Sequence, residues 1–157
     1  MANITSFGQT NYIDLLTRPD VPPLPVWTTT NTRHIDGVER YHLGVCADCI
    51  AQMPAPVKVI IARYTAFLPD YLLDEETELI IAQALGDFST LQEARQTLLK
   101  DWTGEDLVIP NSALPFFLKL KMTENLLFVE RSGVYGRTIT DEFIIDENEK
   151  ITCIKQN

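Results

Sequence analysis

The sequence predicts an α+β fold, in which an N-terminal helical layer packs on a C-terminal antiparallel β-meander. Between residues 39 and 102, apolar residues recur every three or four positions, which is the period of an amphipathic helix. After about residue 105 the period changes to two, as in strands with one buried face. The links between the later segments are short, which favours antiparallel neighbours over crossover connections.

Four helices are predicted, over residues 39–53, 57–68, 74–86 and 90–102. Pro54 separates the first two, since proline lacks the backbone N–H that a helix interior needs. The second segment leaves a strand as an alternative. Asp74 is the expected N-cap of the third helix, and a capping box that begins at Ser89 or at Thr90 opens the fourth.

Four strands are predicted in the C-terminal part, over residues 116–122, 126–131, 137–145 and 151–155. Residues 1–37 lack a sustained period and carry several prolines, so we expect an extended arm there, anchored by the large ring of Trp27. Residues 38–157 are expected to form a single α+β domain, of a common size for one folding unit.

The negative charge of the chain is concentrated in its second part. Residues 1–69 hold five acidic and five basic residues, whereas residues 70–157 hold seventeen and eight, which accounts for the net charge of −9. This balance argues against a nucleic-acid partner and against an anionic membrane surface. We therefore expect a basic protein as the partner, with a merely solvated surface as the alternative. The candidate contact residues are Asp74, Glu75, Glu76, Glu78, Glu147 and Glu149.

The chain has three cysteines, two of them in the pair Cys46-Ala47-Asp48-Cys49. An odd, low count does not form a disulfide framework, and with no apparent secretion signal we expect the cytoplasm. In a helix over 39–53, His42, Cys46 and Cys49 would share one stripe and offer three zinc ligands. Buried core residues and a redox pair are the alternatives. A redox pair usually opens a helix after a strand, whereas this one is expected inside a helix.

The run GRTITDEFIIDENEKI, residues 136–151, is similar to the last hairpin of NTF2-like domains, which include SnoaL-type proteins and ketosteroid isomerase. The shared features are a phenylalanine-bearing strand, an acidic turn and a Lys-Ile pair. The resemblance implies a conical pocket between helices and sheet, which would bind a small apolar molecule. In some members of that family such a pocket supports proton-transfer chemistry.

One acidic residue is a candidate base for such a pocket. Asp141 shares a predicted strand face with Ile139 and Phe143, so it can point inward toward the tyrosines, as acid–base chemistry in a pocket requires of a buried carboxylate. His42 or Tyr64 would then supply the polar contact to the ligand. The alternative places Asp141 in water, at a bulge or a strand end.

We expect an acidic binding or adaptor protein, or an inhibitor of a basic partner, which acts through residues 70–157 without enzymatic activity. One alternative is an NTF2-like pocket protein for a small apolar ligand, whose chemistry would be acid–base catalysis of an isomerase, cyclase or dehydratase type. A second alternative is a small zinc-stabilised module. No nucleotide-binding or metalloprotease motif is present, so no cofactor is expected, and a homodimer stays open.

Overall fold

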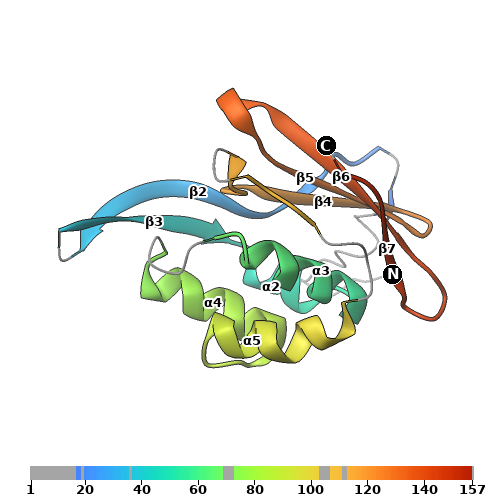
Figure 1. The fold of residues 1–157 in the computed structure, drawn as a ribbon, viewed down its shortest axis with the longest axis horizontal. Coiled ribbons are helices and arrows are strands. Elements are labelled where there is room, and N and C mark those ends of the chain that lie inside the picture. Colours follow the sequence, from blue (N-terminus) through green and yellow to red (C-terminus); the bar gives the residue numbers. More distant parts are fainter. Residues whose placement is uncertain are drawn as a thin grey trace, which may run out of the picture.

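A computed structural model describes residues 17–18, 20–35, 37–68, 73–102, 107–110 and 113–156, without the side chains of residues 29–35 and 38–42. These residues form two layers, a six-stranded sheet and a group of helices that covers one of its faces (Figure 1). The predicted α+β class is confirmed. Residues 1–16 of the predicted arm lie outside this description.

The sheet has the strand order β3-β2-β4-β5-β6-β7, and all its neighbouring strands are antiparallel. Its strands are β2 (Leu24–Ile35), β3 (Val38–Val45), β4 (Leu118–Thr123), β5 (Leu126–Ser132), β6 (Thr138–Ile145) and β7 (Ile151–Lys155). The last four strands are the meander that the two-residue period predicts, because each pairs with the strand that follows it.

The helical layer consists of α2 (Ala47–Ala51), α3 (Ala55–Thr65), α4 (Glu75–Gly86) and α5 (Leu91–Leu98). The caps expected from the sequence are present. The Asp74 carboxylate accepts the Thr77 N–H at 2.9 Å at the start of α4. At the start of α5, the Thr90 hydroxyl accepts the Glu93 N–H and the Glu93 carboxylate accepts the Ser89 N–H, both at 3.1 Å. These bonds satisfy donors that a helix start leaves open.

The helix predicted over residues 39–53 is wrong up to residue 45, since only Ala47–Ala51 of it is helical, as α2, and part of the predicted arm is a strand. Residues 24–35 form β2, and residues 38–45 form β3, which pairs with β2. The missed signal is the dipeptide Asp36-Gly37, since Asp-Gly between two strands favours a two-residue hairpin turn. Gly37 has a φ of +79°, which glycine adopts without strain. Strand pairing therefore overrides a helical spacing of apolar residues in this segment.

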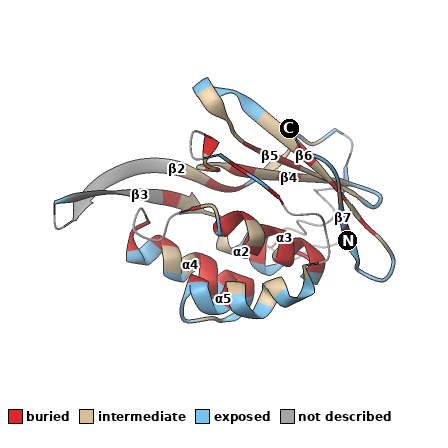
Figure 2. Cartoon of the chain, viewed as in Figure 1, coloured by how far each residue is buried: buried red, intermediate tan, exposed pale blue. Residues whose placement is uncertain are grey.

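Trp27 anchors the N-terminal strands to the rest of the fold. Its side chain is fully buried in β2, and its indole N–H donates to the Pro115 carbonyl oxygen at 2.9 Å. Residues buried from both layers meet in one core, to which α3 contributes Ile60 and the sheet contributes Leu120 and Val129. Figure 2 shows the buried residues between the layers and exposed residues on the outer side of the helices.

Replacement of the buried N-cap tests the start of α4. We expect Asp74→Ala to lower the free energy of unfolding by about 1–2 kcal/mol, because the Thr77 N–H loses its acceptor. Urea denaturation followed by circular dichroism measures this loss. Gln83→Ala, at an exposed position of the same helix, is the control and should change stability by less than about 0.5 kcal/mol. Equal stability of Asp74→Ala and the unsubstituted protein would contradict the capping role.

Candidate functional site

Asp141 points into the core and joins the sheet to the helical layer. Its carboxylate is fully buried in β6 and accepts the Tyr64 hydroxyl of α3 at 2.5 Å. The same oxygen accepts Arg131 Nε at 2.7 Å, and the other oxygen accepts a second Arg131 nitrogen at 3.3 Å. The structure therefore brings together two of the three predicted catalytic residues, Asp141 and Tyr64. The alternative that left Asp141 in water is wrong.

Arg131 is the member of this cluster that the sequence analysis missed. Its guanidinium is 1% exposed and forms a buried ion pair with Asp141. The sequence did contain a signal for a buried partner of Asp141. Leu127, Val129 and Arg131 alternate on the buried face of β5, and they pair with the residues on the same face of β6. Cations and carboxylates at inward positions of neighbouring strands predict such a pair, since a buried charge needs a partner.

The environment of Tyr64 keeps its phenol protonated. Burial raises the pKa of Tyr64 well above its ordinary value, and the adjacent Asp141 carboxylate raises it further. Phe143 packs edge-on against Tyr64, with ring centroids 6.3 Å apart, so an aromatic ring lies beside the cluster. Two surface pockets formed by described residues lie elsewhere, and neither is lined by any member of the cluster. The cluster thus acts as a buried polar link between the two layers.

The cysteine pair lies in a different local structure from the one predicted. Cys46 follows β3 and caps α2, Cys49 lies within α2, and their sulfurs form a disulfide. His42 belongs to β3, so the three residues do not share a helical stripe, and the geometric premise of the zinc site is wrong. The His42 side chain lies outside the described part of the structure. Among the side chains that are described, no group of His, Cys, Asp or Glu is arranged to bind a metal ion.

The six predicted partner-binding residues occupy two separate places. Asp74 is buried as the cap of α4, while Glu75 and Glu76 are exposed in the first turn of that helix, together with the half-buried Glu78. Carboxylates in this turn also stabilise the helix through its dipole. Glu147 and Glu149 are exposed in the turn between β6 and β7, at the other end of the molecule from α4 (Figure 1).

The turn between β6 and β7 has a defined backbone. The Asp146 carboxylate accepts the N–H groups of Asn148 at 2.8 Å and of Lys150 at 2.9 Å. This arrangement is an Asx-type turn, in which a short acidic side chain holds the following residues. The neighbouring turn between β4 and β5 is tied to it, since the Asn125 carbonyl oxygen accepts the Ile145 N–H at 2.9 Å.

An open pocket lies where these two turns meet the start of α3. Its volume is about 440 Å³, and we call it the acidic hollow. The residues that line it are Pro54, Pro56, Met122, Glu124, Asn125, Ile145, Asp146, Glu147 and Glu149. The lining thus combines four carboxylates with apolar side chains and includes no lysine or arginine. A second pocket, of about 510 Å³, lies beside it, but Lys100 and Lys150 line that one and offset its acidic residues.

Comparisons with known proteins give no relative from which a function could be transferred. No family model, no curated protein and no solved structure matches the chain significantly. The resemblance of the last hairpin to NTF2-like domains is therefore neither supported nor contradicted. In the described part of the chain, no helix combines the length and the apolar character that crossing a membrane requires.

Removal of one partner tests the buried ion pair. We expect Asp141→Ala to lower the free energy of unfolding by about 3–5 kcal/mol, because the Arg131 charge stays buried without its carboxylate. The double variant Arg131→Met/Asp141→Leu should lose less free energy of unfolding than Asp141→Ala does. Glu142→Ala is the control, since its ion pair with Lys155 is at the surface and should contribute less than about 1 kcal/mol. Urea denaturation measures all three variants, and equal losses for Asp141→Ala and Glu142→Ala would contradict the pairing.

The raised pKa of Tyr64 predicts a loss of stability in alkali. The folded protein holds the phenol proton more tightly than the unfolded chain, so this contribution is complete below pH 10.0 and falls as the pH rises above it. We expect the free energy of unfolding of the native sequence to decline above that pH more steeply than that of Tyr64→Phe. Urea denaturation at a series of alkaline pH values measures both slopes. Parallel slopes would show that Tyr64 has no part in the decline.

Proposed function

We propose that this protein binds a basic segment of another polypeptide in the acidic hollow. The observation that carries the proposal is the convergence of Glu124, Asp146, Glu147 and Glu149 in one pocket whose lining also contains Met122. The carboxylates attract basic side chains, and the apolar part of the lining suits an apolar side chain between them. The role is that of an adaptor or an inhibitor, as the uneven charge of the chain also favours.

The hollow is preferred to the acidic residues of α4 for two reasons. Asp74 is fully engaged in the interior as a cap, and the dipole of α4 accounts for acidic residues in its first turn. The residues of the hollow have no such local explanation, apart from Asp146, which holds the turn. The hollow also offers concave apolar surface, which a helix surface lacks.

The hollow is held in shape before any partner arrives. Two turns and the first residues of α3 line it, and the backbone bond between Ile145 and Asn125 fixes the turns relative to each other. Glu124 and Glu149 both have positive φ values, of 54° and 64°, so each stands at the tight point of its turn. Preorganised charges lose less conformational freedom on binding than charges on mobile segments. The proposal places this interaction in the cytoplasm, where a disulfide such as Cys46–Cys49 would be transient and not structural.

A matched pair of charge variants tests the proposal. The probe is a short, fluorescently labelled, lysine-rich peptide with one central leucine, and binding is measured by fluorescence anisotropy. We expect Glu124→Gln/Glu147→Gln/Glu149→Gln to weaken binding about tenfold or more, because the lining of the hollow loses three carboxylates. Glu75→Gln/Glu76→Gln/Glu78→Gln changes the net charge by the same amount at α4 and should weaken binding less than about twofold.

Salt dependence provides the second readout. Raising the ionic strength from about 0.05 M to about 0.5 M should weaken binding to the native hollow strongly, since exposed charges are screened. A matched peptide with glutamate in place of lysine should not bind. If both triple variants lose affinity equally, the attraction belongs to the net charge and the hollow is not the docking site.

A further inference from the structure

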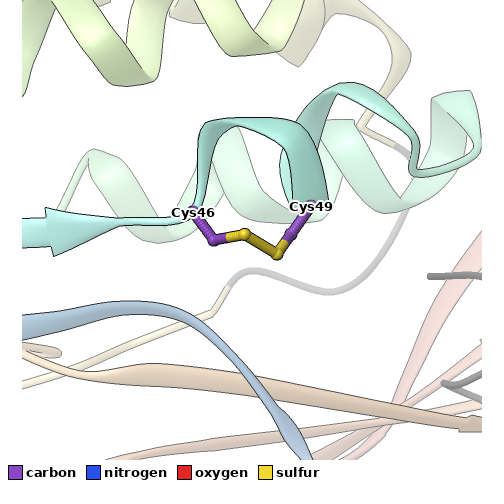
Figure 3. The surroundings of a disulfide bond; sticks show 2 residues. All are labelled: Cys46 and Cys49. Carbon is purple, nitrogen blue, oxygen red and sulfur yellow. A yellow bond between two sulfur atoms is a disulfide. The ribbon is translucent and has the colours of Figure 1, made fainter. Parts of the chain in front are cut away.

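The C-x-x-C pair lies where the N-terminal hairpin passes into the helical layer, and both side chains are on the side of α2 that faces the sheet (Figure 3). The two Cα atoms are 5.2 Å apart. The Cys46 N–H donates to the Val26 carbonyl oxygen of β2 at 2.9 Å, and the Cys46 carbonyl oxygen accepts the Ile50 N–H at 3.2 Å. Backbone bonds that do not require the S–S bond therefore hold the first cysteine in place.

A structural staple is a poor explanation for this bond. A disulfide stabilises mainly by restricting the unfolded chain, and the effect grows with the length of the loop that it closes. Cys46 and Cys49 are only three residues apart, so the closed loop is very short. The surroundings are also well packed without it, because Leu43 before the pair and Ile50 after it are buried in the core.

We propose that Cys46 and Cys49 form a reversible dithiol–disulfide couple, which exchanges electrons with a thiol reductant. The two cysteines differ in exposure as whole residues, since Cys46 is half-buried whereas Cys49 is only 4% exposed. An incoming thiolate therefore reaches the Cys46 sulfur first, and the Cys49 sulfur is the leaving group. This role is independent of binding in the acidic hollow.

The chemistry balances with a thiol such as glutathione as the reductant. A glutathione thiolate attacks Cys46 Sγ, the bond between the two cysteines breaks, and Cys49 leaves as a thiolate that takes up a proton. A second glutathione thiolate attacks the glutathione sulfur of the mixed disulfide and releases Cys46, which is protonated in turn. Two electrons and two protons pass to the protein, and two glutathione molecules leave as their disulfide. Oxidation follows the same steps in reverse.

The remaining cysteine does not belong to the couple. Cys153 lies in β7, whereas the pair follows β3, and these two strands are the opposite outer strands of the sheet. Exchange within the chain is therefore confined to two neighbouring sulfurs, with the accessible one attacked and the buried one resolving the intermediate.

A redox titration of the native chain tests the couple. The protein is equilibrated in buffers with different ratios of reduced to oxidised glutathione, quenched with an alkylating agent and analysed by peptide mass spectrometry. We expect one reversible two-electron transition at Cys46 and Cys49, with circular dichroism unchanged across it and Cys153 outside it. A bond that stays intact in the most reducing buffer, or that does not re-form on oxidation, would overturn the proposal.

Single variants test the unequal roles of the two sulfurs. In oxidised glutathione, Cys49→Ser should retain a mixed disulfide at Cys46, because the resolving thiol is absent. Cys46→Ser should capture at least about tenfold less glutathione at the buried Cys49. Cys153→Ser is the control and should leave the wild-type transition unchanged. Equal capture by the first two variants contradicts the assignment.

Rapid quenching of the native chain during reduction checks the same point, since the transient mixed disulfide should map to Cys46.

Discussion

The buried contact between Arg131, Asp141 and Tyr64 is the interaction on which the two-layer architecture most depends. It joins β5 and β6 to α3, so one carboxylate fixes the sheet and the helical layer relative to each other. A buried charge is tolerated only when its partners are in place, which makes wrongly packed arrangements of the layers costly. The aromatic rings of Phe143 and Trp102, with centroids 6.1 Å apart, pack beside this contact. Aromatic packing and the buried ion pair therefore stabilise the same contact between the sheet and the helical layer.

The sequence predicted the helices α3, α4 and α5 and the four C-terminal strands because local signals there agree with tertiary structure. Asp74 and Thr90 are helix N-caps in the prediction and in the structure. The alternation of apolar residues in β4 to β6 follows the buried face of the sheet. The segment before residue 54 could not be resolved in this way. Apolar residues there fit both a helical and an alternating spacing, so their period alone does not decide; the turn dipeptide Asp36-Gly37 and the pairing with β2 do.

The candidate sites show a similar division between local and tertiary information. The acidic character of residues 146–149 is visible in the sequence, but the hollow also needs Glu124 and the prolines that begin α3, which are distant along the chain. The inward position of Asp141 follows from alternation, whereas its engagement with Tyr64 depends on how α3 docks on the sheet. The C-x-x-C motif was visible as well, yet its place after a strand followed from a hairpin that the apolar spacing concealed.

The position of β2 has a consequence for how the chain folds as it leaves the ribosome. β2 lies between β3 and β4, and its Trp27 bonds to Pro115, 88 residues further along the chain. The N-terminal hairpin can form early, but one of its edges has no strand to pair with until residues 118–120 have been synthesised. An unsatisfied edge is a template for association with other chains, and contacts this remote in sequence form slowly. Synthesis thus includes an interval in which this edge of the hairpin is exposed to association with other chains.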